Sequence, residues 1–482
     1  MAERLTVVPD RARELRDLLF EQGVEFPCGG LSNCGGCRVR VIEGEVPIDD
    51  EMRATLTAAE LEAGWRLGCR ASAAGCVVLE VAQWQASILT DESALDFEPG
   101  EGLSAVVDLG TTTLVVQAVD LKTGEVRAVR SALNPQAVYG ADVMTRIEFD
   151  LREPGVLAAA VRRKVGEMVA DALGGAAARE VLLAGNTVMH HLFCGLEVEP
   201  LAHAPFVSPN LGERRPAAAE LGWSVAGDPA IVFLPCVGGF VGSDIAAGIV
   251  AVGMLERDEL CALMDLGTNG EIVVGSREGA VCASTAAGPA FEAGRIAMGM
   301  RAVAGAIDHV TVEHGALRCH VLDGAEARGI CGSGLVDAVA AGLATGAIRP
   351  NGRLPNGTAL PLAGEVRLSQ RDIRELQLAK GAVAAGFDML AGGRPVSRLF
   401  LAGAFGNYVD AKSARRIGLV SAEPHQVVSA GNTALRGARL LLLNPSRRHA
   451  LLGAVLARTR HVPLADNPEF MDRFAESLAF PA

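Results

Sequence analysis

The stretch Ser104–Val119, SAVVDLGTTTLVVQAV, places an aspartate and a glycine–threonine turn between two apolar strands. The first strand ends near Asp108, and Gly110 lets the backbone approach a phosphate. Thr111, Thr112 and Thr113 supply hydroxyl and N–H donors, while the aspartate is suited to hold magnesium or its water. The pattern predicts a hairpin that grips phosphate, although DLGTTT alone also fits an ordinary hairpin turn.

The same pattern returns in Cys261–Ser276, CALMDLGTNGEIVVGS, with Asp265 in the position of Asp108. Two such units in one chain indicate a duplicated clamp that holds a nucleotide between two lobes. Asp108 and Asp265 are therefore the candidate catalytic residues that position magnesium and water. The second loop's candidate phosphate-binding residues are Gly267, Thr268, Asn269, Gly270 and Glu271.

Other glycine-rich stretches complete this predicted site. In residues 397–409, SRLFLAGAFGNYV, a strand leads into a small-residue loop that admits a nucleoside. Residues 242–253 and 431–443 are rich in alanine and glycine, which lets two helices cross closely between the lobes. Residues 329–342, GICGSGLVDAVAAG, predict a helix whose N-terminus faces a ligand phosphate. The candidate residues of these loops are Gly332, Ser333, Gly334, Gly403, Ala404, Phe405 and Gly406.

Near the N-terminus, the stretch Cys28–Cys37, CGGLSNCGGC, has the spacing C-x5-C-x2-C, and a fourth cysteine, Cys69, follows in GWRLGC. A zinc site normally combines two closely spaced pairs, and a disulfide set is disfavoured in a reducing compartment. The spacing therefore predicts a 2Fe–2S cluster held by Cys28, Cys34, Cys37 and Cys69. MHHLFC, with His190, His191 and Cys194, is a weaker metal alternative because no second ligand pair has a matching spacing.

The flanks of the cysteine loop predict a small α+β domain. Residues 11–26 have the pattern of an amphipathic helix, and residues 37–46 and 76–84 have the patterns of strands. This arrangement resembles the β-grasp ferredoxin domain. Such domains usually open with a two-stranded hairpin, and only LTVVPD precedes the helix here. Either that first strand is missing or the sequence starts internally.

From residue 104 onward the order of motifs resembles the superfamily of actin, sugar kinases and heat-shock chaperone ATPases. A ferredoxin domain followed by such an ATPase resembles the reductive activators of corrinoid-dependent proteins. Further phrases that carry this resemblance are NPQAVYGADVMTRI (134–147), LLAGNTVMHHLF (182–193) and AGPAFEAG (287–294). The expected fold is an α+β β-grasp ferredoxin domain followed by a two-lobed α/β actin-like (ribonuclease H-like) ATPase. The expected parts are ferredoxin 1–83, linker 84–103, lobe I 104–250, lobe II 251–430, and C-terminal helices 431–482 returning to lobe I.

The resemblance implies an ATP-dependent activator that passes one electron from a 2Fe–2S cluster to the Co(II) corrinoid of a methyltransferase system and restores Co(I). Its expected cofactors are the cluster, ATP and Mg²⁺, and its expected partners are a corrinoid protein and an upstream electron donor. Related ATPases often pair, so a homodimer is also expected. Glu292 is expected either to contact the nucleotide or the corrinoid protein, or to be a surface acid. The linker is too short for the extra middle domain that some members carry.

Two other functions remain open at this point. One is an ATP-coupled electron donor to another low-potential enzyme, although activators of that kind carry their cluster cysteines inside the ATPase. The other is a small-molecule kinase with a redox-sensing ferredoxin domain, for which Asp244 is the candidate catalytic aspartate.

Composition narrows the class of protein. The 482 residues carry a net charge of −13 and show no clustered basic face, which argues against nucleic acid as a partner. The N-terminus lacks the apolar segment of a signal peptide. Residues 231–255 are long enough to cross a bilayer, but Pro235 and several glycines favour a buried strand, a turn and a helix. We therefore expect a cytoplasmic protein with no membrane partner.

Overall fold

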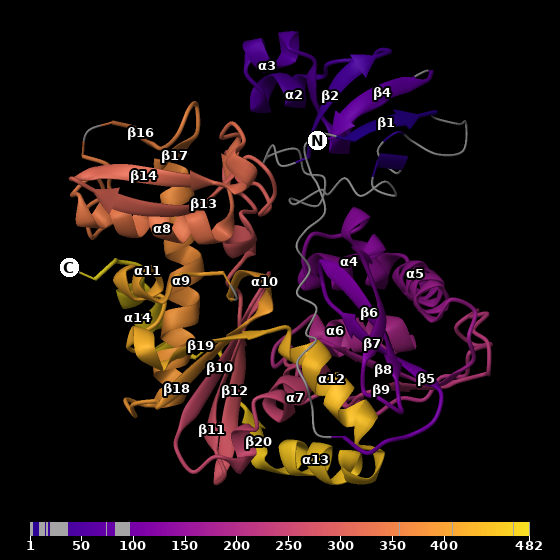
Figure 1. The fold of residues 1–482 in the computed structure, drawn as a ribbon. Coiled ribbons are helices and arrows are strands. Elements are labelled where there is room, and N and C mark those ends of the chain that lie inside the picture. Colours follow the sequence, from indigo (N-terminus) through magenta and orange to yellow (C-terminus); the bar gives the residue numbers. More distant parts are fainter. Residues whose placement is uncertain are drawn as a thin grey trace.

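The computed structural model describes most of the chain, in nine ranges. These are residues 3–8, 15, 18–19, 37–73, 75–81, 97–355, 357–406, 408–465 and 467–481. Cys28, Cys34 and most of the expected linker lie outside the described residues, as does the side chain of Ala404. Figure 1 shows a small N-terminal domain above two larger lobes.

The N-terminal domain is a four-stranded sheet with the strand order β1-β4-β2-β3. Its elements are β1 (Glu3–Val7), β2 (Arg38–Glu43), α2 (Asp50–Thr55), α3 (Ala58–Glu62), β3 (Trp65–Leu67) and β4 (Val77–Val81). Leu15 and Leu19, from the expected helix, are buried in its core. Asp49 and Thr57 cap α2 and α3 by accepting backbone N–H bonds, which fixes where these helices start.

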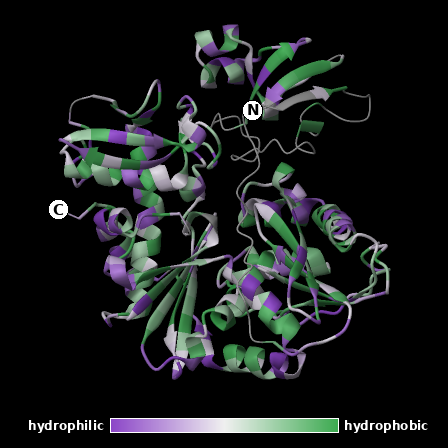
Figure 2. Ribbon diagram, in the orientation of Figure 1, coloured by the Kyte–Doolittle hydropathy of each residue, from purple (hydrophilic) through white to green (hydrophobic). Residues whose placement is uncertain are grey.

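Lobe I is built on a five-stranded sheet with the order β7-β6-β5-β8-β9. The strands are β5 (Leu103–Leu109), β6 (Thr113–Asp120), β7 (Val126–Leu133), β8 (Ala178–Gly185) and β9 (Ala230–Phe233), and the helices are α4 (Val143–Arg152), α5 (Val156–Leu173) and α6 (Thr187–Cys194). The first three strands form an antiparallel meander, and β8 and β9 continue the sheet in parallel with β5. The inner strands are almost wholly apolar, as Figure 2 shows, because helices cover both faces of the sheet.

Lobe II repeats this plan in a six-stranded sheet with the order β19-β18-β10-β11-β12-β20. Its strands are β10 (Cys261–Leu266), β11 (Gly270–Ser276), β12 (Gly279–Thr285), β18 (Arg398–Ala402), β19 (Val427–Gly431) and β20 (Thr459–His461). Again three antiparallel strands come first, and two later strands, β18 and β19, add in parallel. The duplicated design that the two DLGT motifs predicted is therefore present in the fold.

An insertion enlarges lobe II between β12 and β18. It contains η5 (Pro289–Glu292), β13 (Ala306–Glu313), β14 (Ala316–Val321), β15 (Gly329–Ile330), α8 (Gly332–Ala344), β16 (Ala359–Pro361), β17 (Arg367–Ser369) and α9 (Gln370–Ala391). After β18 come α10 (Gly403–Gly406) and α11 (Ala411–Arg416). The glycine-rich stretch 329–342 does form a helix start, at α8.

Helices α7 (Ser243–Ala251) and α12 (Thr433–Leu443) cross between the two lobes. A Cβ added to Gly437 would lie 2.0 Å from the carbonyl oxygen of Ala247, so only glycine permits this approach. The close crossing predicted from small residues is thus confirmed. The stretch 231–255 forms a strand, a turn and a helix as expected, and no helix among the described residues has the length and apolarity needed to cross a membrane.

The C-terminal segment divides between the lobes, which differs from the expected return of 431–482 to lobe I. Helix α12 packs with lobe I, and α13 (Pro445–Arg458) joins it there through an ion pair between Arg448 and Glu180 of 2.6 Å. Strand β20 instead pairs with β12 of lobe II, and α14 (Pro468–Ser477) lies on α9. The reason is that β12 leaves an open edge that β20 fills.

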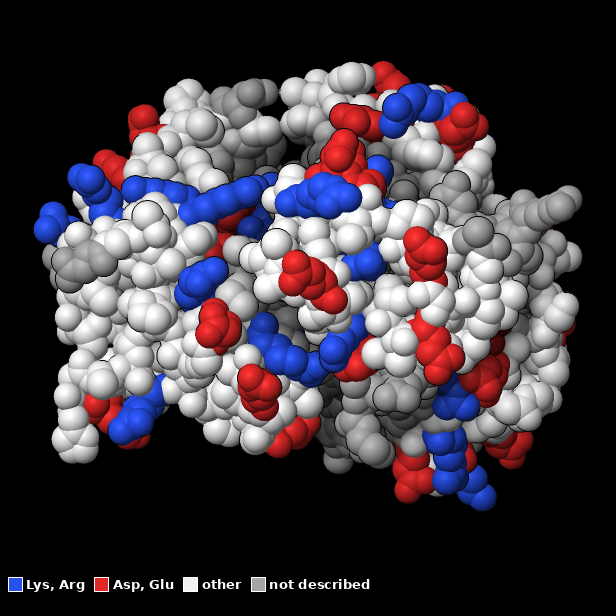
Figure 3. Space-filling view, turned by 90° about the horizontal axis from the view of Figure 1, so that it is seen from above, with Lys and Arg blue, Asp and Glu red and all other residues white. Residues whose placement is uncertain are grey.

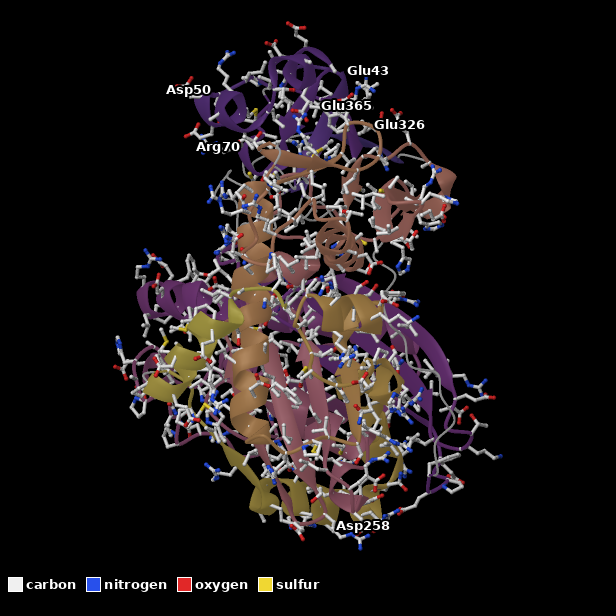
Figure 4. All side chains as sticks on the ribbon, turned by 90° about the vertical axis from the view of Figure 1, so that its left-hand side faces the viewer. Glu43, Asp50, Arg70, Asp258, Glu326 and Glu365 are labelled. Atoms are coloured by element: carbon white, nitrogen blue, oxygen red, sulfur yellow. The ribbon has the colours of Figure 1, made fainter. Side chains whose placement is uncertain are left out.

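The N-terminal domain sits at one end of the two lobes. In Figure 4, Arg70 of this domain lies at the upper end of the molecule and Asp258 of lobe II at the lower end. Over the face seen from above in Figure 3, acidic and basic side chains intermingle.

Candidate nucleotide and cluster sites

Phosphate loop one, residues 108–113, is the turn between β5 and β6. Asp108 is the second-last residue of β5, and Thr113 opens β6. A Cβ on Gly110 would lie 2.5 Å from the carbonyl oxygen of Thr113, so the sharp turn itself requires glycine. All three threonines of the loop are partly exposed, which leaves their donors accessible to a ligand.

Phosphate loop two, residues 265–271, is the equivalent turn between β10 and β11. A Cβ placed on Gly267 would have no neighbour closer than 4.0 Å, so the backbone there is open to close approach by a ligand. Gly403 has φ +81°, and a Cβ on it would lie 2.7 Å from Oδ1 of Asp265. Gly403 therefore makes room for the Asp265 carboxylate, whether or not it also admits a nucleoside.

The two loops meet across the lobes. Oγ1 of Thr112 lies 3.1 Å from Oγ1 of Thr268. Thr268 in turn donates to Oε2 of Glu292 at 2.7 Å. Glu292 thus belongs to the loop-two site in this structure, and the two predicted halves of the clamp form one site.

Four carboxylates gather behind these loops. Burial raises the pKa of Asp108 to about 6 and that of Asp265 to about 7. Burial, together with repulsion from these two groups, raises the pKa of Asp244 to about 8. Burial and the neighbouring Asp244 and Asp265 also hold the pKa of Glu271 well above its usual range. Carboxyl groups buried this close together oppose one another's ionisation, and a cation beside them would favour their charged forms.

Three asparagines that the sequence analysis missed hold phosphate loop one. Each caps its own helix by accepting a backbone N–H at Oδ1, and each donates Nδ2 to the loop. Asn134 donates to the Gly110 carbonyl at 2.9 Å, Asn186 to Oγ1 of Thr111 at 2.8 Å, and Asn432 to Oδ2 of Asp108 at 2.7 Å. Each asparagine side chain therefore caps a helix and also bonds to the loop, so the three of them tie the loop to three separate elements.

The glycines at the start of α8 serve packing. A Cβ on Gly332 would lie 1.8 Å from the carbonyl oxygen of Phe291, and one on Gly334 would lie 2.1 Å from that of Ile307. The hydroxyl of Ser333 donates to the Asp308 carbonyl at 2.9 Å. Their contacts with a ligand phosphate remain a proposal.

Phe405 and Gly406 lie in the short helix α10, directly after Gly403. The ring of Phe405 stacks on that of Phe291 at 4.6 Å between centroids. This stack ties the predicted nucleoside loop to η5, which carries Glu292.

In the N-terminal domain, Cys37 and Cys69 lie side by side. The backbone N–H of Cys69 donates to Sγ of Cys37 at 3.4 Å, and the Gly68 N–H donates to the Cys37 carbonyl at 2.7 Å. Both cysteines are buried in the domain core. A 2Fe–2S cluster requires four thiolates and is tuned by amides that donate to sulfur, so these two adjacent thiols with their amide fit half of the predicted ligand set. Cys28 and Cys34 lie outside the described residues.

The histidines of MHHLFC have structural partners. His191 bonds to the Thr187 carbonyl at 2.8 Å and to Oγ of Ser208 at 2.7 Å, and the His190 ring packs edge-on against Phe233. In the part of the chain that the structure describes, no group of three or more His, Cys, Asp or Glu side chains is arranged to hold a metal ion. A magnesium ion at the carboxylates would therefore take most of its ligands from phosphates and water, as Mg²⁺ usually does.

Comparison with known proteins agrees with this architecture. Three family models match: a 2Fe–2S iron–sulfur cluster binding domain at residues 2–74, the RACo middle region at 103–257, and the C-terminal ASKHA domain of RACo at 259–482. The corrinoid activation enzyme RamQ of Eubacterium limosum is 31% identical over an alignment 443 residues long, which covers 82% of this chain and 74% of RamQ. The chain belongs to the family of corrinoid reductive activators.

One further relative supports the family, and one solved structure shows the same fold. The [Co(II) methylated amine-specific corrinoid protein] reductase of Methanosarcina barkeri is 30% identical, over 71% of this chain and 70% of the relative. The solved structure of a reductive activator for corrinoid, iron–sulfur protein matches with a TM-score of 0.70 and 24% identity. That match covers 98% of this chain and 96% of the other, so the activator fold extends over the whole molecule.

Proposed function

We propose that this protein is an ATP-dependent reductive activator that returns the Co(II) corrinoid of a methyltransferase system to Co(I). The observation that carries the proposal is one chain that joins a ferredoxin domain to a paired phosphate-loop site and aligns along most of its length with corrinoid activators. The cluster, when bound, supplies one electron, and the corrinoid protein is the substrate.

ATP is needed because the electron moves uphill. Plant-type 2Fe–2S centres have potentials near −400 mV, and Co(I) requires a stronger donor. Each 59 mV of mismatch in a one-electron step corresponds to about 1.4 kcal/mol. A nucleotide that changes the contact between the lobes can supply such an amount, provided that the two lobe arrangements bind the Co(II) and Co(I) proteins differently.

The chain's own residues divide this work. Thr111–Thr113 and Thr268–Gly270 donate hydrogen bonds to the phosphates. Asp108 and Asp265 orient magnesium and its waters, and Asp244, buried beside these two carboxyl groups, is the candidate proton acceptor for the attacking water. Gly403–Gly406 border the nucleoside. Cys28, Cys34, Cys37 and Cys69 hold the cluster.

The finer assignments belong to the same proposal. Magnesium as the metal of the ATP site, an upstream electron donor, a homodimer and a cytoplasmic location are predictions from the sequence and the family. A boundary between the lobes at about residue 250 is also a prediction from the sequence. The family models divide the chain near residue 258.

A spectroscopic assay tests the function. The reconstituted protein is reduced, mixed with MgATP and a Co(II) corrinoid protein, and the visible spectrum is followed for Co(I). We expect Cys37→Ser to abolish the signal while nucleotide binding remains, and Asp265→Asn to abolish ATP turnover while the cluster spectrum remains. An unchanged rate of Co(I) formation in both variants would disprove the site assignments.

A further inference from the structure

The segment Leu133–Val138 joins lobe I to the ferredoxin domain. It follows the end of β7 and forms the short helix η2 (Pro135–Val138). Leu133, Ala137 and Val138 pack against the apolar core of the ferredoxin domain, the cluster of residues that includes Cys37 and Cys69. Figure 1 shows the ferredoxin domain above the end of lobe I that carries α4. An apolar contact thus links the cluster-bearing domain to this one segment.

The same segment is bonded to phosphate loop one. The backbone N–H of Asn134 donates to the Thr112 carbonyl at 2.8 Å, and its side chain donates to the Gly110 carbonyl at 2.9 Å. Leu133 pairs with Thr113 across β6 and β7. Asn134, which makes both bonds to the nucleotide loop, directly follows the ferredoxin contact Leu133 and lies three residues before the next contact, Ala137.

A buried polar network makes the segment stiff. Asn134, Gln136 and Arg146 are each 0% exposed. Arg146 donates to the Gly140 carbonyl at 3.0 Å and to Oε1 of Gln136 at 3.3 Å, and Gln136 donates to the Leu157 carbonyl at 3.2 Å. Breaking one hydrogen bond of a buried polar group costs much free energy. The segment therefore moves as one rigid body and does not bend internally.

We propose that residues 133–146 couple the nucleotide state of phosphate loop one to the seating of the ferredoxin domain. Phosphates bound to the loop fix Gly110 and Thr112, and Asn134 carries any shift of the loop to Ala137 and Val138. This shift changes the position of the ferredoxin domain on lobe I. It thereby changes the access of a redox partner to the cluster. This inference rests on the proposed ATP-dependent function and assigns the path by which the nucleotide acts.

The test measures access to the cluster directly. The full chain is reconstituted and reduced, and oxidation of the cluster by ferricyanide is followed by stopped flow with saturating MgADP or with magnesium and a non-hydrolysable ATP analogue. We expect different rate constants in the two states for the parent protein. Val138→Asp should make the two rate constants equal while ATP hydrolysis continues, because this change breaks the apolar contact with the ferredoxin domain and leaves both bonds from Asn134 to phosphate loop one in place.

Matched variants keep the result interpretable. Val207→Asp changes an exposed valine of lobe I that does not belong to the ferredoxin contact. The two oxidation rate constants of this variant should differ as much as those of the parent. Asn134→Ala removes the side-chain bond to the Gly110 carbonyl of phosphate loop one. It should also make the two oxidation rate constants equal at saturating nucleotide. If Val138→Asp fails to fold, Val138→Ala should give a reduced difference.

Equal rate constants in the parent, or a full difference in a folded Val138 variant, would overturn the coupling. Neither result would change the outcome of the Co(I) assay, which tests the proposed function separately.

Discussion

Oγ1 of Thr112 and Oγ1 of Thr268 lie 3.1 Å apart, so the two phosphate loops contact each other through one hydrogen bond between the lobes. Thr268 also donates to Glu292 at 2.7 Å. Replacing Thr268 with the isosteric valine removes both bonds and the hydroxyl that we propose binds a phosphate. We expect MgATP affinity to fall about tenfold, which corresponds to about 1.4 kcal/mol, in a calorimetric titration.

Thr123→Val is the control for this change. Thr123 is exposed in the turn after β6, and its hydroxyl bonds only locally to Glu125. Its replacement should leave nucleotide affinity unchanged. Equal affinities of the Thr268 variant and the parent would show that the contact between the loops does not contribute to binding.

The carboxylate cluster should make the nucleotide-free protein less stable as pH rises. The pKa values of Asp108, Asp265 and Asp244 are raised to about 6, 7 and 8, above their values in the unfolded chain. Raised acids add stability that is complete below about pH 4 and is lost as pH climbs through 6 to 8. Urea unfolding without magnesium or nucleotide should therefore show a decline in stability between pH 5.5 and 8.5.

The variant Asp265→Asn isolates this effect from other titrating groups. It removes one of the mutually repelling charges and keeps the shape of the side chain. Its stability should decline less than that of the parent over the same pH range. A parallel decline in both proteins would contradict the electrostatic account of the cluster.

The crossing of α7 and α12 predicts a strong effect of one methyl group. In Gly437→Ala the new Cβ would lie 2.0 Å from the Ala247 carbonyl oxygen, which belongs to the backbone of α7. We expect a loss of about 1–3 kcal/mol in the free energy of unfolding. Gly453→Ala in α13 meets nothing within 4 Å and should instead stabilise the protein by about 0.5–1 kcal/mol. Similar effects of the two changes on thermal unfolding would refute the packing argument.

The two DLGT hairpins were predictable because their information is local. An aspartate, a glycine and threonines between two apolar strands occur within a few residues, and both copies fold as hairpins. The crossing helices were predictable for the same reason, since small residues recur on one helix face. The ferredoxin strands likewise followed from alternation near the cysteines.

Contacts between distant parts of the chain were not predictable in this way. Asn134, Asn186 and Asn432 meet at one loop although they come from three separate elements, and each has the ordinary pattern of a helix cap. The glycines at the start of α8 suggested a ligand, because a sequence does not distinguish room for a phosphate from room for the Phe291 carbonyl. The pairing of β20 with lobe II likewise depends on an open sheet edge that no local pattern reveals.

Asn432 offers a prediction that separates a structural role from a positioning role. Its Oδ1 caps α12 by accepting from the Leu435 N–H at 2.8 Å, while its Nδ2 donates to Asp108 at 2.7 Å. Asn432→Asp keeps a good helix cap but removes the donor and places a second carboxylate beside Asp108. We expect thermal stability near that of the parent, together with a loss of about tenfold to a hundredfold in kcat/KM for ATP at neutral pH.

The pH profile of the Asn432→Asp variant decides between the two roles. Repulsion between the paired carboxylates raises the pKa of Asp108 further, so the activity should recover at higher pH than in the parent. Asn186→Asp is the matched change, because the Thr111 hydroxyl can turn and donate to the new carboxylate. That variant should lack the alkaline shift, since Asp108 keeps its donor. An Asn432 variant with reduced activity but an unshifted profile would leave Asn432 with a capping role alone.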